Sequence, residues 1–204
     1  MPLLFFIKGL CNKDGRYASG VIIFSKYPII DSGKTKYPGA PAESIIYADV
    51  VKAGDTIRMF TTHMQSFQFT AGDYANIARI KERDEDVLQA TENVSAKMKV
   101  AFEKRTVQAR IVRTETDKCK LPSIICGDFN DVPNSYVYQH IRGERQDAFL
   151  AASFGIGRSF NALAPTLRID YILPDDNFNI QQFQMIDEGL SDHHLLVTDV
   201  SLKK

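Results

Sequence analysis

Short β-type runs that end in polar groups constrain the fold of this chain more than any other feature of its sequence. The runs are rich in β-branched and aromatic residues and are separated by Gly, Pro, Asn and Asp, a pattern typical of strands. Two runs on either side of Lys52–Asp55 predict a hairpin. The segment 34–43, which is rich in Pro and Gly, is predicted to be a loop. Further strands are predicted at 20–30, 122–127, 167–174 and 195–202.

The long segment between the hairpin and the next predicted strand has a different character. From about 72 to 118 it is rich in Ala, Lys, Glu and Arg, and it lacks Pro and, after its first residue, Gly. Its apolar residues recur at helical spacing, which predicts a helix around 73–90 and a longer one around 93–116. The basic side chains alternate with glutamates, so they indicate a solvated face rather than a nucleic-acid interface. Two shorter helices are predicted, from Asn134 or Ser135 to Gly143 and over 147–154.

Composition sets the broad class of the protein. A chain of 204 residues fits a single domain, 1–204, with 72–118 as a helical insertion. The 25 basic residues balance the 25 acidic ones, which excludes recruitment of nucleic acid or an anionic membrane by overall charge. The three cysteines form no CxxC pair and are interpreted as buried free thiols. No apolar run approaches the ~20 residues that span a bilayer, so we expect a soluble monomer, cytoplasmic by default, without an obligate protein partner.

Asp128 and Asn130 stand at the end of the predicted strand SIICG. In an extended chain residues i and i+2 point the same way, so both side chains are expected to project together while Phe129 turns into the core. A carboxylate beside a carboxamide can orient a water molecule and hold a phosphate oxygen or a metal ion. The alternative is that Asp128, Asn130 and Asp131 only form an Asx-turn.

A second set of polar residues lies in the C-terminal third of the chain. Asp170 falls in an otherwise apolar strand, where an acid without a partner is costly to bury. His193 would satisfy it and have its pKa raised; the alternative is pairing with Arg168, or exposure at a sheet edge. Asp192, beside His193, can bind a metal ion through its carboxylate. His63 ends the hairpin and is either a satisfied core or rim histidine or a catalytic group.

All of these groups lie at or near an end of a β-type run, so packed sheets can gather them around one cleft. Such a set suits displacement at phosphorus, in which a divalent cation neutralises the phosphate, an acid orients water and a protonated imidazole stabilises charge. The sequence has no GxSxG, GxxxxGK[ST], GxGxxG or HExxH motif, which excludes the site classes that those motifs mark. The candidate residues are His63, Asp128, Asn130, Asp170, Asp192 and His193.

Five stretches in order, GVIIFSKYPII, FTTHMQS, IICGDFNDVPN, LRIDYILP and LSDHHLLV, resemble the endonuclease/exonuclease/phosphatase superfamily, which has the DNase I-like fold. The resemblance covers about residue 20 to the C-terminus. It implies an α/β fold, a four-layer α/β/β/α sandwich, and a phosphoesterase that depends on Mg²⁺ or Mn²⁺. The implied substrates are the phosphate esters that this fold serves: nucleic acids, inositol phosphates or phospholipid head groups. Relatives of this subtype often carry membrane-spanning segments before the catalytic domain. The resemblance therefore implies that a longer parent chain could be membrane-anchored.

The resemblance also assigns roles to single residues. Asp128 is expected to position or deprotonate the attacking water, and Asn130 to orient that water and a phosphate oxygen. His193, oriented by Asp170, is expected to contact the scissile phosphate. His63 corresponds to the second histidine that faces the phosphate.

The resemblance is incomplete at the start of the chain. Family members begin with a strand ending in Asn and a second strand ending in Glu, the principal metal ligand. Here the first residues hold Asn12 and Asp14 but no acid at the end of a predicted strand, and Glu43 begins a strand. We therefore expect an N-terminally incomplete domain, lacking the first strands, with Asp192 as its metal-associated acid. The alternative is a catalytically weak or inactive relative that binds a phosphorylated ligand.

Overall fold

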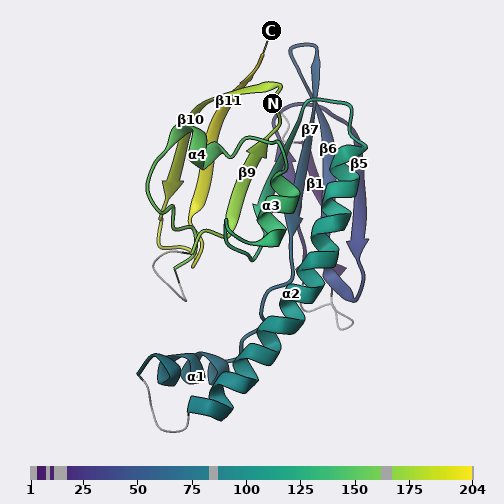
Figure 1. The fold of residues 1–204 in the computed structure, drawn as a ribbon. Coiled ribbons are helices and arrows are strands. Elements are labelled where there is room, and N and C mark those ends of the chain that lie inside the picture. The colour runs from purple at the N-terminus through teal and green to yellow at the C-terminus, as the bar shows by residue number, and fades with distance from the viewer. Residues whose placement is uncertain (1–3, 8–9, 12–17, 83–86, 162–166, 204) are drawn as a thin grey trace.

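A computed structural model of the chain describes residues 4–7, 10–11, 18–82, 87–161 and 167–203. These residues form a mixed α/β fold, which confirms the predicted class (Figure 1). At its centre is a five-stranded sheet in the order β5-β6-β7-β8-β9, in which β7 and β8 are parallel and the other neighbours antiparallel. Its strands are β5 (Ile29–Tyr37), β6 (Ala40–Lys52), β7 (Asp55–His63), β8 (Ser123–Asp128) and β9 (Asp170–Pro174).

The remaining strands of the described residues form antiparallel pairs: β10 with β11, β1 with β4, and β2 with β3. The sequence did not predict β10. Its apolar residues are interrupted by Asn and Gln side chains that face solvent, so the run lacks the apolar content of the other strands. These strands are β1 (Leu4–Ile7), β2 (Leu10–Cys11), β3 (Ala18–Ser19), β4 (Ile22–Ser25), β10 (Phe178–Ile186) and β11 (Leu195–Leu202).

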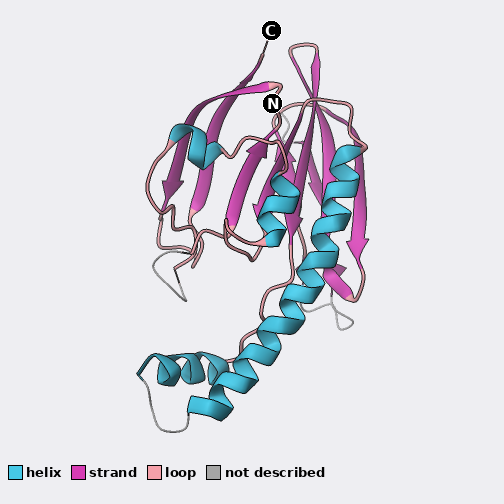
Figure 2. Cartoon of the chain, in the orientation of Figure 1, coloured by secondary structure: helices cyan, strands magenta, loops and turns pink. Residues whose placement is uncertain are grey.

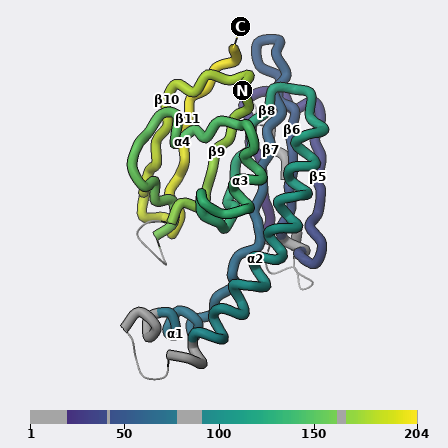
Figure 3. The backbone as a smooth tube through the Cα atoms, viewed as in Figure 1, coloured from purple at the N-terminus to yellow at the C-terminus, as the bar shows by residue number. Residues whose placement is uncertain are grey.

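Helices cover the central sheet and extend beyond it (Figure 2). The second half of α2 and all of α3 pack on one face of the sheet, while α1 and the first half of α2 form an arm that reaches away from the sheets (Figure 3). The break between α1 and α2 comes earlier than predicted, and α3 is capped by Ser135 and ends at Gly143 as predicted. The helices are α1 (Ala71–Glu82), α2 (Val87–Asp117), α3 (Tyr136–Arg142) and α4 (Ala148–Ala152).

The loop prediction for 34–43 is wrong. Strand β5 continues to Tyr37 and β6 begins at Ala40, so Pro38 and Gly39 make only the turn between two long strands. Gly39 supplies the φ of 67° that the turn needs. Pairing between β5 and β6 keeps this segment extended. The segment is rich in Lys, Thr, Gly and Pro, so its local sequence does not predict that pairing.

The main core lies between the central sheet and the helices α2 and α3. Phe60 and Ile125 from the sheet, Val112 from α2 and Tyr138 from α3 are all essentially buried. A second cluster forms under α4, where the rings of Phe149 and Phe183 meet edge to face at 5.7 Å. Within α2, Ala109 and Val112 pack in this core, whereas the apolar residues Phe102 and Val107 are exposed.

The structure tests the predictions about the cysteines and about membrane-spanning segments for the residues that it describes. Cys119 and Cys126 are free thiols, as predicted, but both are partly rather than fully buried. The side chain of Cys11 is outside the described part of the chain. Among the described residues, no helix combines the length and apolarity needed to cross a membrane. Asn12 and Asp14 lie outside the described residues.

Gly127 is required where β8 approaches β7. Its φ is 145°, and a Cβ added to it would lie 1.9 Å from the carbonyl oxygen of Thr62. We expect Gly127→Ala to lower the free energy of unfolding by about 2–4 kcal/mol, because both the backbone conformation and the steric overlap are unfavourable. Urea denaturation followed by circular dichroism measures this loss.

Gly39→Ala is the matched control for Gly127→Ala. Gly39 also has a positive φ, but a Cβ there would meet nothing within 4 Å, so the expected loss is only about 1 kcal/mol. Equal losses for the two variants would contradict a steric role for Gly127.

Candidate active site

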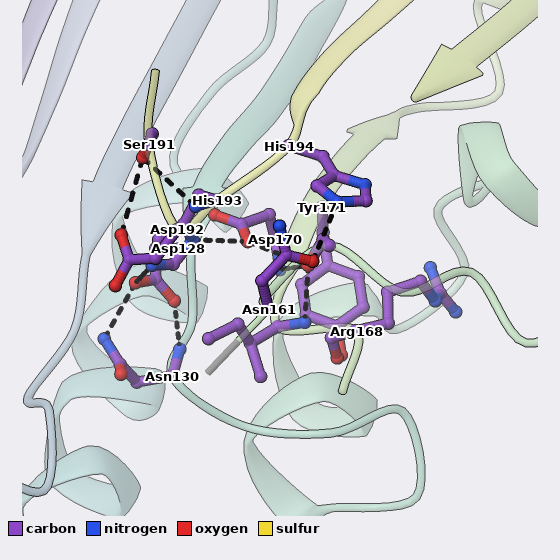
Figure 4. A network of polar contacts seen from close by, with 12 residues as sticks. Asp128, Asn130, Asn161, Arg168, Asp170, Tyr171, Ser191, Asp192, His193 and His194 are labelled. Carbon is purple, nitrogen blue, oxygen red and sulfur yellow. Dashed lines mark hydrogen bonds and ion pairs between the residues drawn. The ribbon is translucent and has the colours of Figure 1, made fainter. Parts of the chain in front are cut away.

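Three adjacent strands deliver predicted site residues to one edge of the central sheet. The parallel strands β7 and β8 end together there, and their last residues, His63 and Asp128, are register partners. Strand β9 runs the other way and begins at the same edge with Asp170, the partner of Asp128. A bridge between Phe160 and His193 holds the loop between β10 and β11 against this edge. Asp128, Asn130, Asp170 and His193 consequently lie together (Figure 4).

Asn130 lies directly against Asp128. Its backbone N–H donates to Asp128 Oδ1 at 2.7 Å, and its Nδ2 donates to Asp128 Oδ2 and to the carbonyl oxygen of Met64, both at 3.0 Å. The N–H contact is the Asx-turn interaction, so the predicted turn is present. A catalytic role for Asp128 and Asn130 stays a prediction. Asn130 has a φ of 52°, so a left-handed turn rather than strand alternation brings the side chains together. Phe129 is fully buried, as predicted.

The Asp170 carboxylate contacts His193. Its Oδ2 is 2.9 Å from His193 Nδ1, and the Ser159 hydroxyl donates to the same oxygen at 2.8 Å. Ser159 is fully buried and was not predicted, because a single serine in a loop carries no sequence signal. The alternative partner, Arg168, instead pairs with Asp147 at 2.7 Å, and both of these side chains are buried. Asp170 is therefore free of Arg168 and orients the His193 ring.

His63 flanks Asp128 on another side, with its Nε2 3.7 Å from Asp128 Oδ2 and 3.4 Å from Asn130 Nδ2. Burial lowers the pKa of His63, although the negative charge of Glu43 acts in the opposite direction. The sequence predicts that Glu43 begins a strand, a position that does not fit a site residue. In fact β6 begins at Ala40, and Glu43 is a buried residue beside Ser44, the register partner of His63.

The pKa values of the two histidines are shifted in opposite directions because their surroundings differ. The hydrogen bond to Asp170 raises the pKa of His193, whereas burial lowers that of His63. Burial also raises the pKa of Asp128 to about 7, and the charge of Asp170 acts in the same direction. The site therefore combines a histidine that holds its proton more firmly than usual, His193, one that holds it less firmly, His63, and a carboxyl group whose pKa lies near neutral pH.

The donor set fits a hard divalent cation. Among the described residues, Asp128, Asp170 and His193 each offer a ligand atom, and these atoms lie within 4.8 Å of one another. Carboxylate oxygens are the ligands that Mg²⁺ and Mn²⁺ prefer, and a cation would relieve the cost of two nearby carboxylates. Asp192, the predicted metal-associated acid, is exposed and lies outside this group, with its Oδ1 3.5 Å from the Ser191 hydroxyl.

These groups face a cleft of about 270 Å³. Five of the six predicted residues line it: His63, Asp128, Asn130, Asp192 and His193. The sixth, Asp170, acts on it through His193. Much of the remaining wall is aromatic and comes from the segment after β7, the start of α1 and Phe160.

The raised pKa of Asp128 makes the stability of the protein depend on pH. The pKa of this carboxyl group is higher in the folded than in the unfolded state. The free energy of unfolding therefore falls as pH rises from the unfolded-state pKa to the folded-state pKa. Above pH 7, the free energy of unfolding of Asp128→Asn should therefore exceed that of wild type by about 1–3 kcal/mol. This advantage should shrink as pH falls from 7 to 4. Urea denaturation in EDTA measures it.

Asp199→Asn is the control for Asp128→Asn, because Asp199 is an exposed acid on β11 that does not line the cleft. This variant should match wild type at every pH. If the advantage of Asp128→Asn stayed constant from pH 4 to 8, ionisation of Asp128 would not be its cause.

Comparisons with known proteins agree with this geometry. A model of the endonuclease/exonuclease/phosphatase family matches residues 3–193. No curated protein sequence matches the chain. A Bacteroides thetaiotaomicron protein of this family superposes with a TM-score of 0.64 and 16% identity, over 99% of this chain and 76% of that chain.

Two further structures have named activities or ligands. A mannosyl-6-phosphatase from Bacteroides thetaiotaomicron superposes with a TM-score of 0.62 and 16% identity, over 98% of this chain and 77% of that chain. The human Nocturnin catalytic domain with bound sulfate anion has a TM-score of 0.61 and 17% identity, over 99% of this chain and 72% of that chain. At these identities the likeness shows a shared fold, the DNase I-like fold expected from the sequence. The family match covers most of the chain, and the chain belongs to the endonuclease/exonuclease/phosphatase family.

Proposed function

We propose that this protein hydrolyses phosphate esters by in-line attack of water, with a bound divalent cation. The observation that carries the proposal is the partly buried carboxylate of Asp128, which lies between His63 and the His193–Asp170 pair at the edge of the cleft. The membership of the family, whose members act on phosphate esters, supports the same reaction class.

Asp128 serves as the group that accepts the proton of the attacking water. Its pKa of about 7 places it near neutral pH, where a general base both exists in its ionised form and holds a proton well. Asn130 fixes the carboxylate by donating to both of its oxygens, once from the backbone and once from the side chain. The side-chain oxygen of Asn130 is then available to accept a hydrogen bond from the water.

His193 supplies positive charge to the phosphate. Asp170 accepts at Nδ1, which leaves Nε2, 4.0 Å from Asp128 Oδ2, as the donor on the cleft side. A protonated imidazole in this position donates to a phosphate oxygen and stabilises the charge that develops as water attacks. His63, with its lowered pKa, is the neutral hydrogen-bonding partner on the other side.

Asp128 and Asp170 would hold Mg²⁺ or Mn²⁺, with Asp192 at the rim as a further carboxylate. When bound, the cation neutralises the phosphate and lowers the cost of bringing a dianion to two carboxylates. The mannosyl-6-phosphatase with the same fold favours a phosphate ester of small size as the substrate.

Loss of either central group should remove most of the activity. With bis(4-nitrophenyl) phosphate and Mg²⁺ or Mn²⁺, we expect Asp128→Ala and His193→Ala each to lower kcat/KM by about 100-fold or more. EDTA should abolish turnover and added cation restore it. Release of 4-nitrophenol measures the rate, and calorimetric titration measures cation binding.

Asp199→Ala is a suitable control, because Asp199 is an exposed acid on β11 away from the cleft. Unchanged turnover in both Asp128→Ala and His193→Ala would refute the assignment. Cation and phosphate binding without any turnover by wild type would favour a relative that binds but does not hydrolyse.

The dependence of kcat/KM on pH should be bell-shaped. Its rising limb follows ionisation of Asp128, at or below about pH 7 because a cation favours the carboxylate, and its falling limb follows deprotonation of His193. Asp170 raises both pKa values, so Asp170→Asn should move both limbs to lower pH. Asp192 acts only weakly on His193, so Asp192→Asn should move the falling limb alone, and less. Stationary limbs in Asp170→Asn would contradict this account.

A further inference from the structure

A wall of aromatic side chains stands beside the proposed phosphate site. The rings of Phe67 and Phe69 stack with centroids 5.0 Å apart and planes 14° apart. Tyr74, in the first turn of α1, meets Phe69 edge to face at 5.9 Å. All three line the same cleft as His63 and Asp128, and the reaction described above uses none of them. We call Phe67, Phe69 and Tyr74 the aromatic wall.

The aromatic wall is not part of the core. Phe67 and Phe69 are half-buried and Tyr74 is 43% exposed, so their rings present apolar surface to the cleft. Aromatic rings gathered in a concave site are typical of surfaces that bind a ligand.

The Phe67 end of the wall packs against a buried arginine. The guanidinium of Arg105 lies 4.6 Å from the centroid of Phe67 and is fully buried. Arg105 donates from Nη1 to the Gln65 carbonyl oxygen at 2.9 Å and from Nε to Asp131 Oδ2 at 3.2 Å. Because Asp131 directly follows Asn130, these contacts fix the wall relative to the Asp128–Asn130 corner.

The chemistry of the cleft favours a planar ring over other groups. Among the described residues, the lining of the cleft contains no Lys or Arg, so the cleft suits an ester with little charge beyond its phosphate rather than a polyanion. Gln68, between the two stacked phenylalanines, has a φ of 53° and lines the cleft with a carboxamide that can both donate and accept. Phe160 closes the site beside His193, with ring centroids 4.7 Å apart.

We propose that the aromatic wall binds a planar aromatic group carried by the phosphate ester, either a nucleobase or a simple aryl ring. The inference rests on the proposed function, because it places the phosphate of that ester at Asp128 and His193. Stacking of a ring on an aromatic side chain changes affinity by roughly tenfold or more. The substrate class is therefore a small, ring-bearing phosphate ester.

Binding of phosphonates tests the proposal without turnover, because their C–P bond resists hydrolysis. The probes are methylphosphonate, benzylphosphonate and the methylenephosphonate analogue of thymidine 5′-phosphate, titrated calorimetrically with Mg²⁺. We expect at least one ring-bearing probe to bind about tenfold or more tighter than methylphosphonate. Which of the two ring-bearing probes binds more tightly distinguishes an aryl ring from a nucleobase.

Phe69→Ala and Tyr74→Ala should each remove about tenfold of the affinity for the ring-bearing probe and leave methylphosphonate unchanged. Phe69→Leu, which keeps apolar bulk but no ring, should lose most of the same preference. Tyr136→Ala is the matched control, because Tyr136 is an exposed tyrosine outside the cleft and should behave as wild type. Circular dichroism verifies that each variant is folded.

Equal affinity for all three phosphonates, or ring preference that survives Phe69→Ala and Tyr74→Ala, would overturn the proposal. Tighter binding of octylphosphonate than of either ring-bearing probe would also overturn it, in favour of an acyl chain. These outcomes are separate from those for hydrolysis. Turnover without ring preference refutes only the aromatic wall, whereas ring preference without turnover refutes only the proposed reaction.

Discussion

The pairing of β8 with its two neighbours is the constraint on which the site depends. Asp128 is the register partner of His63 on β7 and of Asp170 on β9, so one residue at the end of one strand fixes the spacing of three. The parallel pairing places two carboxyl ends at the same edge, and the antiparallel neighbour adds an amino end. Gly127, immediately before Asp128, makes the close approach to β7 possible.

This arrangement brings like charges together in a poorly hydrated place. Burial and the charge of Asp170 both raise the energy of the ionised form of Asp128. Asp170 is satisfied by His193 and Ser159, whereas Asp128 keeps a pKa of about 7 and thus a proton that it can exchange. A bound cation would stabilise the ionised form of the Asp128 carboxyl group. The raised pKa of the same group is the property that a proton acceptor in catalysis requires.

Much of the fold and of the site could be predicted from the sequence. The hairpin, β8, the caps of α3 and the contact between Asp170 and His193 follow from alternation, capping residues and the cost of a buried acid. The errors have a common cause. Residues 34–37, residues 40–43 and β10 are strands because another strand pairs with them. Ser159 bonds to Asp170, and the charge of Glu43 acts on His63, because the fold brings together segments that are remote in the sequence. Neither effect leaves a local pattern.

The sequence by itself determined which chemical groups stand at the strand ends and the family to which their order belongs. Only the tertiary structure decided which atoms meet and which charges they carry. His63 and His193 look alike in the sequence, yet burial lowers the pKa of the first and Asp170 raises that of the second. A pKa depends on desolvation and on nearby charges, and both are set by segments that lie far apart along the chain.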